Sequence, residues 1–496
     1  MTIHLSLILW LPAVAGALAL LGRRAAGWVA FAGSLLALAY SVLLLADFDA
    51  GSGALQYVTD ETWIEQLGIH YKLGVDGLNV ALILLTTFGF TACTLWAALS
   101  REYPAQFFMW MGLAHSSVLG ALVAQDLILF VLFFDLMLVP FFFLTGIWGG
   151  PDRRQAILKL FIYTLVGSLL MLAAAVAIGI NSGSSLDGTT FVLSELDRVV
   201  LPEGTQRWIF LCFAAAFLIK MPAVPFHGWM PDGYRNMPLP VLAVFSAVLS
   251  KVAAYGFLRV VTPLLPDATA DFQMLILLIA LASILYGSAM AFTTTETRLI
   301  LGYSSVAQLG FITLGVFSLD DDGAQGAILQ SVNHGLVVIP AFFIVGLLAA
   351  RAGGSSDLRD MGGTAFRAPV LAGLFLVVAL ATLAMPGSSN FVGEFLILFG
   401  VFESKIVIAI VAFTGVVLAS VYMLRMFIRS MHNRVGTGVD PRDIKLVDAV
   451  VLVPLVLVII ALSLYPQVLL DKGEETVPGK VQAAHQAAEG EAVAGR

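Results

Sequence analysis

Residues 208–226 read WIFLCFAAAFLIKMPAVPF, and this stretch decides the class of fold. Twelve apolar residues in a row lead to Lys220, and Pro222 and Pro225 follow it at once. An apolar helix of about 20 residues crosses the roughly 30 Å of hydrocarbon in a bilayer. A charge costs free energy inside such a helix, and proline removes a backbone donor from it. The stretch therefore predicts a membrane-spanning helix that is interrupted next to a buried charge.

The composition of the whole chain agrees with a membrane location. Of its 496 residues 59% are hydrophobic and 12% are charged, whereas roughly a quarter of an ordinary soluble domain is charged. A soluble fold of this size could not cover its surface with so few charges. The net charge of −7 carries no long basic run, so nothing indicates a nucleic-acid partner.

Apolar runs predict an all-α, polytopic membrane protein with about fourteen transmembrane helices. A polar loop is expected over 47–75, and a hydrophilic, disordered tail over 471–496. The predicted spans are 5–22, 26–46, 78–100, 105–124, 126–148, 156–180, 208–225, 240–262, 273–292, 297–318, 324–350, 369–398, 402–428 and 446–470.

The distribution of arginines predicts the topology. The leading MTIHLS lacks basic residues while Arg23 and Arg24 follow the first run, the reverse of a secretory signal, so we expect an uncleaved first helix. With these arginines in the cytoplasm, fourteen spans place both termini outside. The cytoplasmic side then also receives Arg101, Arg153, Arg154, Arg351, Arg359, Arg367, Arg429, Arg434, Arg442 and Lys445. The opposite side receives Asp60, Glu61, Glu65, Glu195, Asp197, Asp320, Asp321 and Asp322.

The cysteines and short motifs limit the chemistry of this chain. Cys93 and Cys212 are the only cysteines and lie far apart in apolar runs, whereas an iron–sulfur cluster needs four ligands. The sequence has no GxGxxG after a strand, no GxxxxGK[ST] and no HExxH. We expect no metal and no cofactor on this chain, so any associated redox chemistry belongs to another chain.

Ionisable residues inside apolar runs are the candidate functional residues. Lys220 and Lys251 lie in such runs, as do Asp135 and Glu394. His115 and His334 complete the set. They can be structural ion pairs or snorkelling side chains. They can also pass protons, because a low dielectric disfavours the charged form and brings proton exchange toward neutral pH. We favour a proton path.

Two predicted helices look broken, at Pro222 and Pro225 in helix 7 and at Pro386 and Gly387 in helix 12. Irregular backbone at membrane depth is tolerated where protein or water fills the gap, and matched breaks indicate inverted repeats with an ion site at each break. Helices 4–8 and 9–13 would be two five-helix repeats, although proline-kinked packing is the alternative. Asn333, His334 and Pro340 could interrupt helix 11 similarly. The expected units are 1–104, 105–262, 263–428 and 429–496.

At these residues the sequence resembles the antiporter-like M-type subunit of respiratory complex I, the NADH:quinone oxidoreductase. The resemblance covers about 74–426. It rests on GVDGLN (74–79), FFDLMLVPFFFLTGIWGG (133–150), YTLVGSLLMLAA (163–174), KMPAVPFHGWMPD (220–232), YSSVAQLGF (303–311), QSVNHGL (330–336) and PGSSNFVGEFLIL (386–398).

The resemblance implies roles for the buried residues. Asp135 would pair with Lys220, Lys251 would be the central lysine, and His334 would lead to Glu394, from which protons leave. Three positions depart from the family pattern. Asp135 stands where glutamate is usual, His115 where a helix-4 glutamate is frequent, and Gln308 where a histidine is common. DGYRNMPLP at 232–240 also differs, so His115 and Gln308 are accessory candidates only.

The resemblance further implies a proton-translocating subunit driven by electron transfer in other subunits. NADH, FMN, iron–sulfur clusters and quinone would belong to those partners, and neighbouring antiporter-like subunits of the membrane arm would flank the chain. The expected location is a bacterial plasma membrane. The alternatives are a subunit of a multi-component sodium/proton antiporter, a membrane-arm subunit of a related hydrogenase or dehydrogenase, and a non-conducting structural subunit.

Overall fold

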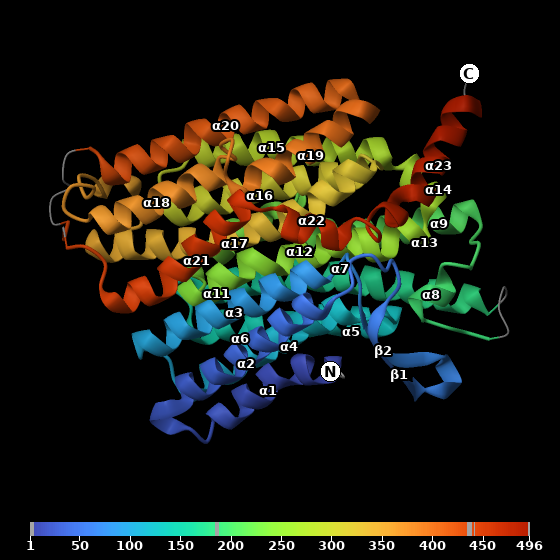
Figure 1. Cartoon of the computed structure of the whole chain (residues 1–496), viewed down its shortest axis with the longest axis horizontal. Coiled ribbons are helices and arrows are strands. Elements are labelled where there is room, and N and C mark those ends of the chain that lie inside the picture. Colours follow the sequence, from blue (N-terminus) through green and yellow to red (C-terminus); the bar gives the residue numbers. More distant parts are fainter. Residues whose placement is uncertain (1–3, 184–187, 434–438, 441, 495–496) are drawn as a thin grey trace.

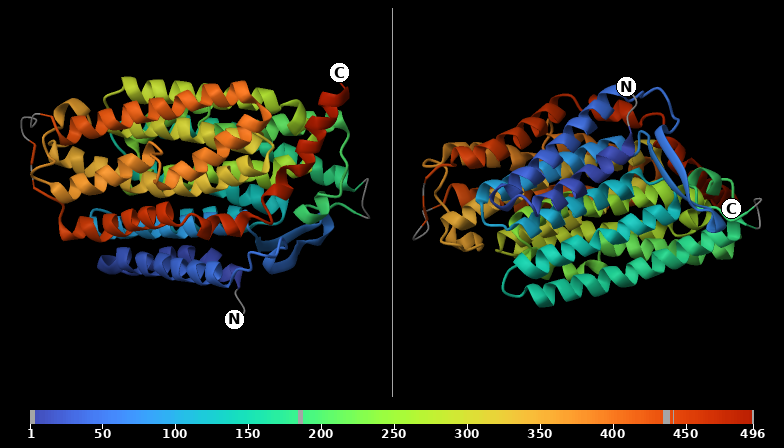
Figure 2. Two further views of the ribbon diagram at one scale, coloured as in Figure 1. Left: turned by 45° about the horizontal axis from the view of Figure 1, so that its top comes forward. Right: turned by 90° about the horizontal axis from the view of Figure 1, so that it is seen from below.

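The computed structural model describes residues 4–183, 188–433, 439–440 and 442–494, and these form a bundle of long helices (Figure 1). The helices run side by side along the long axis of the molecule in all three views (Figures 1 and 2). Eleven helices of the described residues are long and apolar enough to cross a membrane. The predicted all-α membrane fold is confirmed, while the count of fourteen spans and the two inverted repeats stay predictions.

The first half of the chain contains the elements up to α10, which lies just beyond the first break. After α1 (Leu5–Ala19) and α2 (Ala26–Asp47), the strands β1 (Gln56–Ile64) and β2 (Ile69–Val75) form an antiparallel pair. There follow α3 (Val80–Ser100), α4 (Ala105–Val123), α5 (Leu127–Leu136), α6 (Leu138–Trp148), α7 (Arg153–Ser182), α8 (Leu193–Leu196), α9 (Glu203–Lys220) and α10 (Met230–Asn236).

The second half begins with one continuous helical rod over 239–264. This rod contains α11 (Leu239–Val244), α12 (Ser250–Gly256) and α13 (Thr262–Leu264), joined by the π-helical segments Phe245–Leu249 and Phe257–Val261. The remaining helices are α14 (Pro266–Asp271), α15 (Gln273–Thr293), α16 (Thr297–Phe317), α17 (Asp321–Arg351), α18 (Pro369–Thr382), α19 (Ser389–Ser404), α20 (Ile406–Met431), α21 (Leu446–Leu464), α22 (Gln467–Gly473) and α23 (Pro478–Ala494).

Two segments that were expected to lack regular structure are ordered, so both predictions were wrong. The loop at 47–75 contains the β1–β2 hairpin, in which Asp60 contacts His70 and Lys72 of the opposite strand at 2.7 Å. The charged residues of this segment lower its mean hydropathy, so its β-branched and aromatic residues, which favour strands, were overlooked. The tail is helical through α22 and α23, because Val477, Val481 and Ala484 form a buried face at helical spacing.

The two predicted helix breaks are present. The helix α9 ends at Lys220, and five residues separate it from the next helical turn, which begins at Phe226. The predicted span 369–398 is two helices, α18 and α19, separated around Gly387, whose φ of +90° suits glycine. The predicted interruption of helix 11 was wrong, since α17 runs unbroken through Asn333, His334 and Pro340. One proline forfeits a single backbone bond, and close packing on all sides keeps α17 helical.

The helices that carry the candidate residues lie in the centre of the bundle. The 239–264 rod and α16 are fully buried along their most apolar stretch, whereas α21 is only 28% buried. The turns that join α1 to α2 and α17 to α18 lie at one end of Figure 1, and the hairpin, α8 and α23 lie at the other. Which end faces the cytoplasm stays a prediction, and Arg434 lies outside the described residues.

Candidate functional site

The first break holds Lys220 inside the bundle. Beyond the last turn of α9, the Met221 N–H donates to Phe217 and the Ala223 N–H donates to Leu218, while Pro222 has no N–H to give. The Lys220 side chain is buried, and its Nζ donates to the Phe134 carbonyl at 2.5 Å and lies 3.4 Å from the centre of the Phe134 ring. The ammonium group is therefore solvated by a carbonyl and an aromatic face.

Asp135 lies beside this lysine without bonding to it directly. The two side chains are within electrostatic reach, but no ion pair of 4 Å or less joins them in the part of the chain that the structure describes. Asp135 is half-buried on α5, and its Oδ1 has no hydrogen-bond partner among the described residues. The resemblance implies a direct ion pair between Asp135 and Lys220, and this pair is not formed here. Aspartate is one methylene shorter than glutamate, and the Lys220 ammonium donates to Phe134 instead.

Lys251 is the most deeply placed charge of the 239–264 rod, with 1% of its surface exposed. Its Nζ donates to the Ser246 carbonyl at 2.7 Å and contacts Ser250 Oγ at 3.3 Å. The π-helical segments on either side widen the helix around it, as π segments at functional sites frequently do. His334 of α17 lies within electrostatic reach of Lys251. No carboxylate neutralises Lys251 within ion-pair distance among the described side chains.

Glu394 of α19 is held by two glutamines. Gln308 Nε2 of α16 donates to Glu394 Oε1 at 2.7 Å, and Gln330 Nε2 of α17 donates to Gln308 Oε1 at 2.7 Å. Gln330 Nε2 also lies 3.4 Å from Glu394 Oε1. The second carboxylate oxygen, Oε2, is buried and has no partner in the described structure. The two oxygens of this carboxylate therefore differ, since amides bind only Oε1.

Buried polar atoms without a described partner gather between His334 and Glu394. Asn333 Nδ2 donates to the Ser389 carbonyl at 2.6 Å and so ties α17 to the second break. The atoms without a partner there are His334 Nδ1, Asn333 Oδ1, Ser388 Oγ, Ser389 Oγ, both Asn390 amide atoms, Gln330 Oε1 and Glu394 Oε2. Since buried polar groups are almost always hydrogen-bonded, this cluster is suited to ordered water.

His115 is placed differently. Its ring stacks on Phe90 with 4.5 Å between the ring centres and 3° between the planes. Both ring nitrogens are buried without a partner in the described structure. Its surroundings are apolar, and it joins none of the contacts that link Lys220, Lys251 or Glu394. The structure does not connect His115 with the other candidates.

Several polar residues near the site were missed by the sequence reasoning. Gln330 lies one helical turn before His334, within a motif that was singled out for its other residues. Tyr422 of α20 bonds to Ser304 at 2.9 Å and lies within electrostatic reach of Glu394. Arg259, two turns beyond Lys251, interrupts an apolar run as visibly as the lysines do.

Arg259 forms a buried ion pair with Asp76 at the hairpin end of the rod. Its Nη1 and Nη2 donate to the two carboxylate oxygens at 2.7 and 2.6 Å, and its Nε donates to Tyr255 Oη at 2.8 Å. Tyr255 in turn donates to the Leu122 carbonyl at 3.0 Å. Because each guanidinium nitrogen and both carboxylate oxygens have a partner, we assign this group to anchoring the rod.

The comparison with known families fits this arrangement of buried charges at two broken helices. Residues 124–419 match the family described as NADH:quinone oxidoreductase/Mrp antiporter, transmembrane. The chain belongs to this family. A protein named NADH-quinone oxidoreductase subunit M from Rhodobacter capsulatus is 35% identical over 503 residues, with 97% of each chain covered.

Two solved structures are similar to this chain along nearly its whole length. A chain of respiratory complex I from Thermus thermophilus has a TM-score of 0.89 at 30% identity, over 98% of this chain and 100% of that one. A chain of the Mrp complex from Dietzia has a TM-score of 0.81 at 19% identity, over 99% of this chain and 55% of that one. The second likeness shows the fold alone.

Among its described residues, this chain has no group of three or more histidine, cysteine, aspartate or glutamate side chains that could hold a metal ion. The expectation that this chain binds no metal or cofactor stays a prediction. The candidate site is a set of buried and half-buried ionisable side chains within a helix bundle.

Proposed function

We propose that this chain is the M-type, proton-translocating membrane subunit of an NADH-quinone oxidoreductase. The observation that carries the proposal is the burial of Lys220 and Lys251 in the bundle without a direct carboxylate partner among the described residues. A buried ammonium without a counter-charge is costly, so a fold that keeps two of them retains them for a task. Whole-length identity to subunits named NADH-quinone oxidoreductase subunit M supports the same task.

The charge of Asp135 sets the first step. When Asp135 and Lys220 approach, the carboxylate stabilises the protonated lysine; when they separate, the ammonium loses that support and releases its proton more readily. The arrangement described here, with Lys220 donating to the Phe134 carbonyl, is the separated one. A change that reaches Asp135 from a neighbouring subunit would alternate the two arrangements.

Lys251 and His334 carry the middle of the route. Lys251 has only hydroxyl and carbonyl partners, so its proton can leave without breaking an ion pair. The ring of His334 can accept a proton at its unpartnered Nδ1 and pass it on. Water bound to the hydroxyl and amide groups at the second break would complete the link to α19.

Glu394 is the last proton-exchanging group of the proposed route, and Gln308 is not a carrier. An amide neither takes nor releases a proton near neutral pH. Gln308 and Gln330 instead fix Oε1, so the proton enters and leaves at Oε2. This role replaces the histidine that is common in the family at position 308.

The rival assignment is a subunit of a sodium/proton antiporter. Its support is the fold shared with the Mrp complex, whereas the matches that extend over the whole chain and exceed 30% identity bear the name NADH-quinone oxidoreductase subunit M. As parts of the proposal, the membrane is the bacterial plasma membrane, both termini face outward, neighbouring antiporter-like subunits flank the chain, and NADH, FMN, iron–sulfur clusters and quinone belong to partner subunits.

The test uses the assembled complex in proteoliposomes. NADH oxidation should drive proton uptake without sodium, and Glu394→Gln should reduce that uptake while the chain stays in the complex. Glu394→Asp, which keeps a carboxylate, should retain part of it. Proton movement that requires a sodium gradient instead of NADH would favour the antiporter. Unchanged uptake by Glu394→Gln would remove Glu394 from the route.

A further inference from the structure

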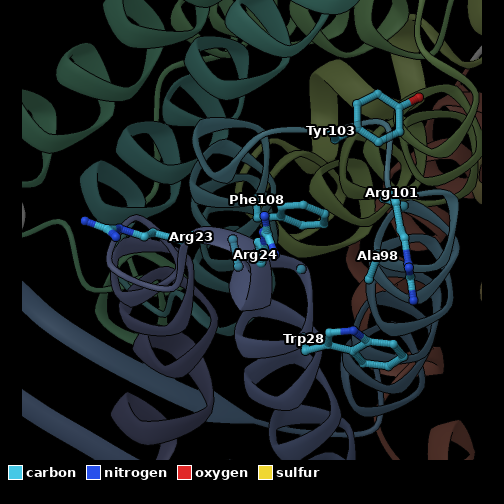
Figure 3. Close-up of a pocket in the computed structure, with 10 residues that line it drawn as sticks. Arg23, Arg24, Trp28, Ala98, Arg101, Tyr103 and Phe108 are labelled. Atoms are coloured by element: carbon cyan, nitrogen blue, oxygen red, sulfur yellow. The ribbon is translucent and has the colours of Figure 1, made fainter.

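A pocket of about 420 Å³ lies at the end of the bundle where α1 turns into α2, and its lining residues include none of the proton-route candidates. The turn between α1 and α2 forms one wall, and the turn between α3 and α4 forms the other (Figure 3). Its main lining side chains are Arg23, Arg24, Trp28, Arg101, Tyr103 and Phe108. In Figure 3, Arg24 and Arg101 come from opposite walls, and Arg23 extends away along the outer rim.

The arginines of this pocket have no counter-charge. Within residues 4–183, 188–433, 439–440 and 442–494, no carboxylate lies within 4 Å of any of the three guanidinium groups. The nearest acid in the sequence, Glu102, lines a neighbouring pocket with Trp96 and Leu239, and Tyr103 borders both pockets. The pocket therefore carries a concentrated positive charge that the chain itself does not balance.

The remaining lining groups suit a molecule that is polar at one end and apolar at the other. The indole of Trp28 is 47% exposed, and Leu21 in the adjoining turn is 80% exposed. Indole rings prefer the boundary between headgroups and hydrocarbon. Burial raises the pKa of Tyr103 to about 12, so its hydroxyl stays protonated and can donate a hydrogen bond.

We propose that this pocket binds the phosphate headgroup of an anionic phospholipid of the surrounding bilayer. Arg24 and Arg101 would contact the phosphate from the two walls, since the guanidinium fork matches phosphate oxygens. The acyl chains would follow the exposed apolar faces of α1 and α2, where Leu18 and Leu36 are more than half exposed. This site is independent of the proton route and of the proposed function.

A lipid fits the observations better than a small anion or a protein carboxylate does. Trp28 lines the charged pocket, and the exposed leucines lie on α1, on α2 and in the turn that joins them. Neither free phosphate nor a carboxylate makes use of such an apolar surface. A bilayer also supplies anionic headgroups at the depth of these turns, where each nearby arginine strengthens binding by roughly fivefold.

The experiment measures lipid retained by the complete complex. The complex is reconstituted in nanodiscs of phosphatidylcholine with phosphatidylglycerol and released in mild detergent, and its bound phosphatidylglycerol is counted by native mass spectrometry. The double variant Arg24→Gln, Arg101→Gln should retain phosphatidylglycerol at least tenfold less well at this site. Arg154→Gln is the matched control, because Arg154 is an exposed arginine in the first turn of α7 and lies outside the pocket. The double variant Arg24→Lys, Arg101→Lys should keep most of the bound lipid.

Three outcomes would overturn the proposal. Equal phosphatidylglycerol counts in the wild type and the glutamine double variant would show that the pocket holds no lipid. Loss of the lipid on adding millimolar inorganic phosphate would show that the pocket prefers a free anion. A glutamine double variant that keeps its lipid but separates from a neighbouring subunit would assign the arginines to a protein contact.

Discussion

Lys251 offers the most direct test of the proton route, because its substitution by methionine separates charge from shape. Methionine fills nearly the volume of the lysine stem and keeps the packing within the 239–264 rod. It removes the Nζ contacts to the Ser246 carbonyl and to Ser250. It also removes a buried ammonium for which the described structure provides no carboxylate.

The structure sets the expected magnitudes. Two hydrogen bonds from a charged donor contribute about 1.5–3 kcal/mol each, and an unpaired buried ion costs several kcal/mol, so Lys251→Met should leave stability unchanged or raised. Proton transfer should suffer strongly. Moving a charge through the bilayer centre without a protonatable group costs about 2.5–3.5 kcal/mol, which corresponds to roughly a hundredfold loss of rate.

The assay is NADH-driven proton uptake by proteoliposomes, normalised to the amount of this chain in the complex. Lys251→Arg should fail as well, since arginine does not release its proton. Lys159→Met is the matched control, because Lys159 forms a partly exposed ion pair with Asp232. Uptake near the wild-type rate in Lys251→Met would refute the route, and uptake by Lys251→Arg alone would show that a fixed charge suffices.

The remaining predictions concern three contacts. Asp135→Asn should impair proton uptake much more than Asp135→Glu, because only glutamate keeps the charge that acts on Lys220; equal uptake by both would make that charge irrelevant. Gln308→Met removes a hydrogen bond of about 1.5–3 kcal/mol to the Glu394 carboxylate. The pH of half-maximal proton uptake should therefore rise by about one to two units. In the control variant Gln273→Met this pH should stay unchanged. Asp76→Asn leaves Arg259 buried and unpaired and should destabilise the chain by about 3–5 kcal/mol; failure of an added Arg259→Gln to restore part of this stability would contradict the assignment.

The Asp76 pair also predicts a dependence on pH. Burial alone would raise the pKa of Asp76, but the adjacent Arg259 holds it below its ordinary value. A lowered folded-state pKa stabilises the fold above the unfolded value of about 4 and stops doing so as the pH falls through the folded value. Thermal unfolding should therefore show a contribution of this pair at neutral pH that disappears only in strong acid, and Asp76→Asn should lack it.

The sequence predicted the membrane fold and the helix breaks because both follow from local chemistry. Apolar runs of membrane length can hardly form anything but helices in a bilayer, and the prolines around Lys220 and Gly387 prevent a continuous helix. The hairpin at 56–75 and the helix α23 were not predicted, because mean hydropathy does not register on which face of an element each residue lies. Their apolar residues occupy one face only, and that face becomes visible by its period rather than by its average.

The residues of the site were easier to predict than their partners. A charge in an apolar run is visible in the sequence, as Lys251 and Glu394 are, but the atom that solvates it is contributed by another helix. Phe134 offers Lys220 a backbone carbonyl, which leaves no trace in residue identity. Gln330 is polar in a mostly apolar helix, yet its link to Gln308 requires knowing that α16 and α17 face α19. Long-range geometry therefore limits what the sequence can tell about this site.

The two breaks hold their charged side chains in different ways, and in the proposed route this difference sets the direction of proton transfer. At the first break the structure solvates Lys220 with a carbonyl and a ring, so the site stabilises a positive charge weakly. At the second break two amides bind one oxygen of Glu394, so the site supports a negative charge. In the proposed route, Lys251 and His334 connect the weakly stabilised ammonium of Lys220 with the amide-bound carboxylate of Glu394. A proton released at Lys220 thus meets acceptors in sequence toward α19, provided that Asp135 is withdrawn, and restoring Asp135 to Lys220 reverses the preference and reloads the lysine.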